Sequence, residues 1–233
     1  MDYESFVTQL EQDREWRERE MRTLLNDLAG RESEEARDEF RRPLVALQYA
    51  HYEGFTKFAL QHYVNAVNTK ALKCSEVTHE LVALSFAKVF RELRNPDPKG
   101  RLFKGALPTD TPLHKFAREV HFLTEMDDVF GKLLVINDDA IDTESNLTPA
   151  VLRKNLFRLG LSMDFVDGID ADLNRLVGIR NEITHGDSKM KRGVTVDDYG
   201  KFSGACKKAM DNVDSQVRDA YRSNRYLKSS LAA

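Results

Sequence analysis

The chain has 233 residues, and its 35 lysines and arginines against 38 aspartates and glutamates give a formal net charge of −3. A composition of 41% hydrophobic and 31% charged residues, with only 12 glycines and 6 prolines, is typical of a globular protein rich in helix. It excludes collagen-like, disordered and disulfide-framework proteins. No run approaches the roughly 18 apolar residues of a membrane span, and no leader-like pattern opens the chain, so we expect a cytoplasmic protein with no membrane partner.

Helical periodicity dominates the first third of the chain. The first predicted helix runs from about Asp2 to Leu28, and Gly30 follows it where a left-handed C-terminal cap is common. The second runs from about Ser33 to Thr69, and Pro43 marks either a break or a fresh first turn within it. Because Leu44 to Val67 is apolar on most faces, this helix is predicted to be the buried centre of a bundle.

The middle of the chain is predicted to be interrupted by one long loop. A third helix covers about Ser75 to Leu93, with Ser75 as its N-cap. The stretch from Asn95 to Pro112 carries four of the six prolines and two glycines, which is typical of a loop. Helical pattern resumes from about Leu113 to Leu134.

Three further helices complete the prediction. Thr148 caps a helix that has Pro149 in its first turn and reaches about Leu159; the others run from about Ile169 to Thr184 and from about Val196 to Tyr221. No segment alternates with period two for long enough to require a sheet. The sequence therefore predicts an all-α bundle with extra helices and one long Pro/Gly-containing loop, in a single domain over 1–233.

One predicted helix combines an apolar stripe with chemically capable side chains. Arg180 falls inside the apolar stripe, where a charge is costly unless it meets a partner or a ligand. Asn181 and His185 lie one turn apart on its flank, in a ridge of small and polar residues. Arg180 and His185 differ by about 140° around the helix, so they can line two walls of a cleft that a second copy, related by a two-fold axis, would complete.

This pair of side chains suits metal-independent RNA cleavage. An imidazole can take and return a proton near neutral pH, and a guanidinium can stabilise the charge of a phosphorane. The competing interpretation is structural: His185 closes the helix ahead of Gly186, and Arg180 pairs with a buried carboxylate. Spacing alone favours the structural interpretation, because an Arg and a His at such a distance occur by chance.

The surrounding sequence carries a family resemblance. The run LVGIRNEITHGD resembles the signature of the HEPN superfamily, whose helical members carry Arg-Asn-x-x-x-His near the end of a late helix. The segments RRPLVALQYAHYEGFTKFALQHYV and SNLTPAVLRKNLFRLGL resemble the toxin-like RiboL-PSP-HEPN branch and occur in the same order. The resemblance spans about Glu15 to Ala209. Two departures are mild: Tyr52 stands where Trp is frequent, and Thr184 where Ala is frequent.

The resemblance implies a homodimeric endoribonuclease that leaves 2′,3′-cyclic phosphate and 5′-OH ends and uses neither cofactor nor metal. Arg180 would stabilise the transition state, His185 would be the acid/base group, Asn181 would position phosphate or orient His185, and Glu53 would support a catalytic side chain. RNA would be the substrate, in a toxin–antitoxin or anti-phage defence setting with an antitoxin or sensor protein as partner. The alternative is a non-catalytic HEPN-type module that binds a nucleotide, an RNA or a protein.

Several other residues are predicted to be structural. His51 and His62 are interpreted as core histidines, and Cys74 and Cys206 as reduced thiols. The aromatic residues of the second helix are assigned to the core by default; they include Tyr49, Tyr52 and Tyr63.

Two Glu-x-x-His pairs suggest a di-metal bundle enzyme as a different class of function. They are Glu76 with His79 and Glu182 with His185. We disfavour this interpretation because Glu182 lies about 130° from the apolar centre of its helix, and because Glu76 is predicted in a first helical turn, where the dipole alone favours a carboxylate.

Overall fold

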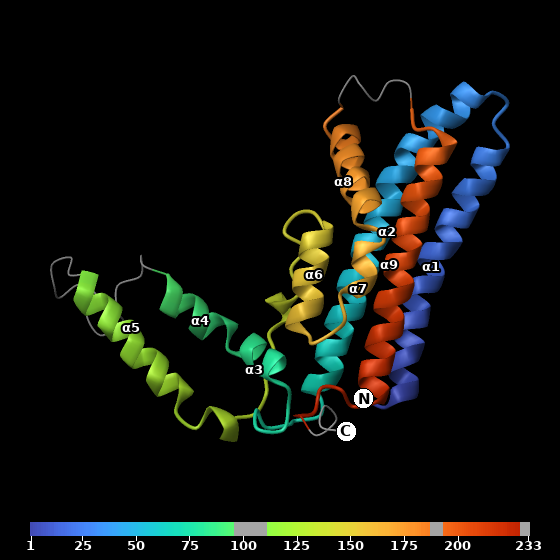
Figure 1. Ribbon diagram of the computed structural model, residues 1–233. Coiled ribbons are helices and arrows are strands. Elements are labelled where there is room, and N and C mark those ends of the chain that lie inside the picture. Colours follow the sequence, from blue (N-terminus) through green and yellow to red (C-terminus); the bar gives the residue numbers. More distant parts are fainter. Residues whose placement is uncertain (96–110, 187–192, 229–233) are drawn as a thin grey trace.

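The structure is a computed structural model that describes residues 1–95, 111–186 and 193–228 (Figure 1). Every regular element within them is a helix, and β-type pairing there is confined to two isolated bridges, Lys73 with Leu133 and Val77 with Leu227. The predicted all-α fold is thereby confirmed. The predicted loop falls mostly outside the described residues, and its final two positions open a helix instead.

Four helices form the main bundle: α1 (Tyr3–Ala29), α2 (Glu34–Asn68), α8 (Asp170–Thr184) and α9 (Val196–Arg222). α2 lies in the middle and packs against the other three (Figure 1). These bounds agree with the predicted ones to within two residues. Gly30 caps α1 as predicted, but the left-handed conformation expected of it is wrong, because Gly30 has φ −77° and stays in the right-handed helical region.

The central position of α2 follows from its sequence. Its first turn is capped by Ser33, whose hydroxyl accepts from the Ala36 N–H at 3.1 Å, and it carries two glutamates that favour the positive end of the helix dipole. The helix continues through Pro43 without a break. Apolar and aromatic side chains point in most directions, and those that are fully buried include Val45, Tyr49, Tyr52, Phe55, Leu60, Tyr63 and Val67.

The two histidines of α2 are buried, as predicted. His62 stacks on Phe6 with 4.6 Å between the ring centroids, and its Nε2 lies 3.1 Å from the Phe6 carbonyl oxygen. His51 contacts the edge of Trp16 and pairs with Glu20 at 3.0 Å. Both rings therefore fix α1 against α2.

Three shorter helices lead away from the bundle: α3 (His79–Ser85), α4 (Ala87–Arg94) and α5 (Thr111–Met126). α4 and α5 pack against each other and form an arm set apart from the bundle (Figure 1). The single predicted helix from Ser75 is wrong on two points, since helix begins only at His79 and is interrupted at Phe86. The predicted helix to Leu134 is also too long.

Backbone pairing between distant segments explains these corrections. The Cys74 N–H donates to the Lys132 carbonyl at 2.9 Å, and the Ser75 N–H donates to the Phe130 carbonyl at 3.0 Å. Segments 72–77 and 129–134 thus satisfy each other's polar backbone groups, which removes the need for helical hydrogen bonds. The second segment opens with the short 3₁₀ helix η2 (Val129–Gly131).

The chain returns to the bundle through α6 (Pro149–Arg158) and the single turn α7 (Asp164–Asp167). α6 was predicted with these bounds to within one residue. Arg153 on α6 forms ion pairs of 2.7 Å with Asp167 and 2.6 Å with Asp170, the first residue of α8. α6 is therefore tied to the beginning of α8.

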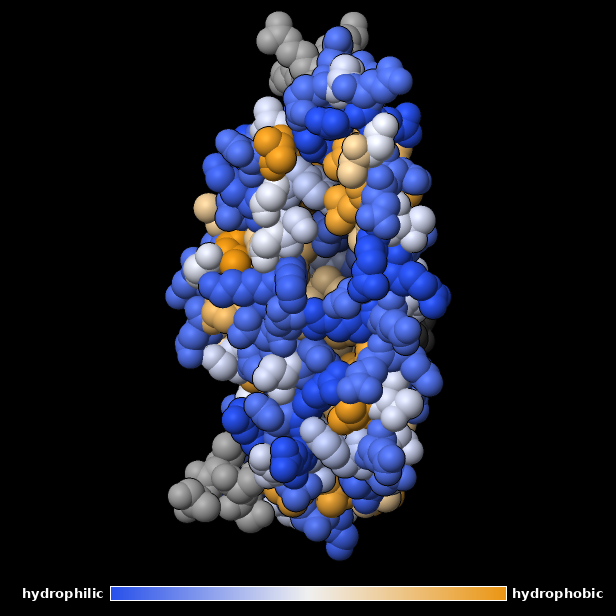
Figure 2. All heavy atoms as spheres, turned by 90° about the vertical axis from the view of Figure 1, so that its right-hand side faces the viewer, coloured by the Kyte–Doolittle hydropathy of each residue, from blue (hydrophilic) through white to orange (hydrophobic). Residues whose placement is uncertain are grey.

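The side of the molecule that α1 covers is mostly hydrophilic, with apolar residues in separate spots (Figure 2). None of the helices in the described ranges is long and apolar enough to cross a membrane. Both cysteines, Cys74 and Cys206, are buried and unpaired, and burial raises the pKa of each thiol.

Candidate functional site

α8 carries three of the predicted site residues, and its sequence explains where it begins and ends. Asp170 and Asp172 lie in its first turn, where acidic side chains favour the helix dipole. Leu176 and Val177 are among the residues buried against the bundle. The helix ends at His185, and Gly186 follows with φ +68°, the left-handed conformation that glycine adopts at low cost.

The guanidinium of Arg180 lies over the ring of Tyr49 on α2, 4.9 Å from its centroid. Its Nη1 donates to Oδ1 of Asn146 at 3.2 Å and to Oδ1 of Asn181 at 2.9 Å. Within the described residues Arg180 forms no ion pair, so the carboxylate partner of the structural interpretation is not found among them. The charge is held by an aromatic face and two amide oxygens, and it stays available to an anion.

Tyr49 connects this cation to the rest of the site. Its phenol oxygen accepts the Leu147 N–H at 2.6 Å, and its side chain is almost fully buried. Burial, and secondarily the nearby carboxylate of Glu53, raises the pKa of Tyr49, whereas Arg180 lowers it. Glu53, which was predicted as a supporting residue, therefore lies beside Tyr49 one turn further along α2.

Asn181 is the second predicted residue that contacts Arg180. Its side-chain oxygen accepts from the guanidinium, and its backbone oxygen accepts the His185 N–H at 3.0 Å. Asn181 thereby links the guanidinium to the last turn of α8. The residue is half-buried.

The imidazole of His185 is exposed, and within the described part of the chain it forms no hydrogen bond. The structure therefore brings Arg180, Asn181 and Glu53 to one place, while His185 projects from the end of the same helix. Its position as the closing residue of α8 agrees with the structural interpretation of the sequence. An exposed imidazole at a helix end is also free to meet a substrate.

Two residues of the site were missed at the level of sequence. Tyr49 was assigned to the core alone, and Asn146 was not singled out. Tyr49 is buried as predicted, but one face of its ring also supports Arg180. The sequence offered one signal for them. Asn146 and Leu147 both belong to the segment SNLTPAVLRKNLFRLGL, which resembles the family, and both contact this cluster.

The Glu-x-x-His pairs do not form a common site. Glu76 lies before α3 rather than in a first helical turn, and its carboxylate accepts the Lys73 N–H at 2.7 Å. In the described ranges, no group of three or more His, Cys, Asp or Glu side chains is placed to hold a metal ion.

Comparison with known proteins gives one match. A family model described as HEPN_MAE_28990-like HEPN matches residues 6–226, which run from the first turns of α1 to just beyond α9. No curated protein and no solved structure matches the chain.

Proposed function

The chain belongs to the HEPN_MAE_28990-like family of HEPN domains, and on this premise we propose that it is a metal-independent endoribonuclease. The family match bears out the HEPN resemblance of the sequence and does not extend to the RiboL-PSP-HEPN branch. A nuclease-related or RNA-related role is the coarse function that the family supports. The reaction, its residues and its setting are our proposal.

The proposed reaction uses the substrate's own hydroxyl as nucleophile. The neutral imidazole of His185 removes the proton from a 2′-OH, and the oxygen attacks the adjacent phosphorus. The bond from phosphorus to the 5′-oxygen breaks, a protonated imidazole donates to that oxygen, and 2′,3′-cyclic phosphate and 5′-OH ends result. Arg180 stabilises the added negative charge on the phosphorane, and the Asn181 amide positions a phosphate oxygen.

The observation that carries this proposal is the cation at Arg180, which forms no ion pair with any of the described residues. A structural arginine at half-buried depth usually pairs with a carboxylate, because leaving it unpaired is costly. Here Tyr49, Asn146 and Asn181 hold the guanidinium without cancelling its charge. Such an arrangement is suited to a ligand that brings its own negative charge, as a phosphodiester does.

A homodimer would complete the site. One imidazole cannot act on both sides of the phosphorus at the same moment, whereas two copies related by a two-fold axis would supply two. Gly178 lies on the exposed flank of α8 between the site and the beginning of the helix, and a Cβ at this position would meet no atom. This flank therefore leaves room for the second copy's α8.

We further propose that the enzyme acts in the cytoplasm as a toxin or anti-phage effector. An uncontrolled ribonuclease would damage its own cell, so an antitoxin or a sensor protein is the expected partner.

The test is a cleavage assay on a denaturing gel with tRNA and mRNA in the presence of EDTA. The parent protein is expected to cut, and His185→Ala is expected to lose cleavage by at least about a hundredfold, the usual contribution of a general acid/base group. His79→Ala is the matched control, since His79 is an exposed histidine at the beginning of α3. It should cut as the parent does and leave the same cyclic phosphate ends.

Two outcomes would contradict the proposal. Loss of parental cleavage in EDTA would exclude the metal-independent mechanism. If folded parent and folded His185→Ala both fail to cut but bind RNA or a nucleotide equally, the non-catalytic binding module is the correct function.

A further inference from the structure

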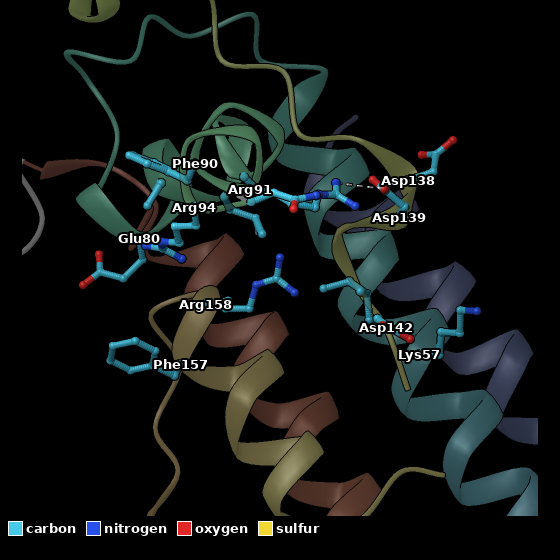
Figure 3. Close-up of a pocket in the computed structure, with 15 residues that line it drawn as sticks. Lys57, Glu80, Phe90, Arg91, Arg94, Asp138, Asp139, Asp142, Phe157 and Arg158 are labelled. Atoms are coloured by element: carbon cyan, nitrogen blue, oxygen red, sulfur yellow. Dashed lines mark ion pairs between the residues drawn. The ribbon is translucent and has the colours of Figure 1, made fainter. Parts of the chain in front are cut away.

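A second candidate site, which contains arginines, lies at the opposite end of α6 from Arg180. A cleft of about 980 Å³ opens between α4, the end of α6 and residues 138–142 (Figure 3). Among its lining side chains are the cations Arg91, Arg94 and Arg158 and the aromatic rings Phe90 and Phe157. This combination of arginine and exposed phenylalanine is unlike the mostly hydrophilic α1 side of the molecule (Figure 2).

The arginines of the cleft are only partly neutralised. Arg91 approaches Asp139 at 4.0 Å, a distance at the limit of an ion pair, and Arg158 donates to the Ala140 carbonyl at 2.8 Å. Arg94 lies 5.9 Å from the ring centroid of Phe90 and forms no ion pair in the described ranges. Two guanidiniums, those of Arg94 and Arg158, thus lack a carboxylate partner there.

Three of the four carboxylates of the cleft come from a different wall, and the fourth, Glu80 on α3, lies beside Arg94 (Figure 3). Asp138, Asp139 and Asp142 belong to the segment around the short 3₁₀ helix η3 (Asp138–Ala140), whereas the arginines come from α4 and α6 (Figure 3). The Asp142 carboxylate already accepts the Glu144 N–H at 2.8 Å. An extended anion along the arginine wall would therefore have Glu80 as a carboxylate on the same wall, with the three aspartates on the opposite one.

Phe157 provides an apolar surface beside this wall. It is 63% exposed, although it directly precedes Arg158 near the end of α6. An exposed aromatic ring next to a guanidinium can stack a nucleobase while the arginine contacts the adjoining phosphate.

The cleft and the proposed active site lie at opposite ends of one short helix. Asn146, a partner of Arg180, precedes α6, and Arg158 is its last residue. Ten residues of α-helix span about 15 Å, which corresponds to roughly four stacked nucleotides at about 3.4 Å each. The ion pairs of Arg153 hold α6 to the start of α8, so this separation is fixed.

We propose that the cleft between α4 and α6 binds the single-stranded flank of the RNA substrate, with phosphates on Arg94 and Arg158 and a base on Phe157. The proposal rests on the proposed ribonuclease function, because RNA is the ligand that reaches both ends of α6. An acidic peptide would also meet the arginines. It would gain less from Phe157 and would have no reason to continue toward Arg180.

The test measures RNA binding by fluorescence anisotropy in a His185→Ala background, so that no strand is cut. Two labelled single-stranded RNAs are compared. One of about three nucleotides is too short to span α6, and one of about twelve nucleotides is long enough to span it. Arg94→Gln is expected to weaken binding of the longer RNA about three- to tenfold and to lower its salt slope by about 1, as loss of one phosphate contact requires. The shorter RNA cannot span α6, so it should bind the background protein more weakly than the longer RNA does.

Three further variants sharpen the result. Phe157→Ala is expected to weaken the longer RNA at least about fivefold through lost stacking. Asp138→Asn is expected to strengthen it, because an exposed negative charge leaves the opposite wall. Arg19→Gln removes an exposed arginine of α1, on the other side of the bundle, and should change neither RNA.

The outcomes separate this proposal from the proposed function. If the parent cleaves RNA but Arg94→Gln and Phe157→Ala bind the longer RNA as the background does, the cleft proposal is wrong and the nuclease stands. If these variants lose RNA affinity but the parent cleaves nothing, the cleft stands and the nuclease fails. If polyglutamate displaces RNA and Phe157→Ala has no effect, the cleft takes an acidic peptide instead.

Discussion

Arg180 shows how a single residue can keep its charge inside a packed protein. Stacking on Tyr49 contributes about 0.5–2 kcal/mol at partly desolvated depth, and the two asparagine oxygens satisfy one of the donor nitrogens. Neither kind of contact neutralises the guanidinium. The remaining nitrogens can therefore meet a phosphate in the paired geometry that arginine and phosphate share.

This geometry predicts that Arg180→Lys is not a conservative change. Lysine keeps the charge but cannot stack flat on Tyr49 while donating to Asn146 and Asn181, so we expect kcat for RNA cleavage to fall about 10²-fold, as when a transition-state donor is removed. Single-turnover kinetics would measure this fall in the cleavage rate. Arg175→Lys on the same helix is the control, since a lysine can retain the exposed ion pair with Asp198. Equal rates for the two variants would argue against a role for Arg180 in the reaction.

Burial of the α2 histidines predicts an acid-sensitive core. Burial lowers the pKa of His62 below its usual 6.5, despite the opposing hydrogen bond to the Phe6 carbonyl. The unfolded chain therefore binds a proton that the folded chain resists, so the stabilising contribution is complete above about pH 6.5 and is lost as pH falls. His51 behaves in the same direction, because burial also lowers its pKa.

We expect His62→Gln to lose less stability than the parent between about pH 7.5 and about pH 5.5. Urea unfolding at the two pH values gives the difference for each protein. The carboxylates are the same in both proteins, so their contributions to the pH dependence of stability cancel in the comparison. His51 is still present in the variant, which therefore keeps part of the loss of stability at low pH. A parent and variant with the same pH dependence would show that His62 does not titrate differently in the folded state.

At the scale of elements, the long helices could be predicted because their signals are local. Ser33 and Thr148 each cap the helix that follows, and the core stripe of α2 lies within one segment. The errors around Ser75 and Leu134 have one shared cause, since segments 72–77 and 129–134 pair with each other across the chain. Helical periodicity cannot report a partner more than fifty residues away.

The candidate site was predictable to a similar degree. Arg180, Asn181 and His185 could be found from one helix, whereas Tyr49 and Asn146 become part of it only when α2 and the segment before α6 fold against α8. Tyr49 and Arg180 lie far apart in the sequence, so no regular spacing between them could indicate that the ring and the guanidinium stack. That is why Tyr49 was assigned to the core alone.

The approach to α9 contains a contact that depends on glycine. Gly193 has φ +82°, and a Cβ there would lie 2.2 Å from the backbone carbon and oxygen of Asp38 on α2. The next residue, Val194, donates its N–H to the same Asp38 oxygen at 2.9 Å. Gly193 thus allows the chain to lie directly on the first turns of α2.

Gly193→Ala is therefore expected to destabilise the protein by about 1–3 kcal/mol, through the strained φ and the clash. Gly204→Ala is the matched control: it lies in the helical interior of α9, its Cβ would meet nothing, and it should gain about 0.5–1 kcal/mol. Both values can be read from chemical denaturation. A neutral Gly193→Ala would contradict the close approach of the two segments.

At the scale of the whole molecule, α2 and α8 form one wall of a site whose other wall would be a second copy. The exposed imidazole of His185 and the open flank at Gly178 lie along the same helix, and α6 braces its beginning. The bundle would therefore present α8 as a rigid unit to the proposed second copy.

A mixing experiment tests this composite site. Arg180→Ala and His185→Ala are each expected to be inactive, but about half of the dimers formed from an equal mixture would carry one intact Arg180 and one intact His185 in the shared site. We expect mixing to restore measurable cleavage, slower than that of the parent, because the one remaining imidazole can serve as base or as acid but not as both at once. If the mixture remains as inactive as either variant, although sedimentation shows that the dimers exchange, each copy acts alone.

The two buried thiols can report how readily two different regions of this fold open. Cys206 is buried in the bundle on α9. Cys74 is buried where segments 72–77 and 129–134 pair, next to the arm. Alkylation requires an exposed thiolate, so each cysteine reacts only when its own region opens. Pulse alkylation followed by mass spectrometry would compare the two opening free energies in one sample and reveal whether the arm detaches before the bundle unfolds.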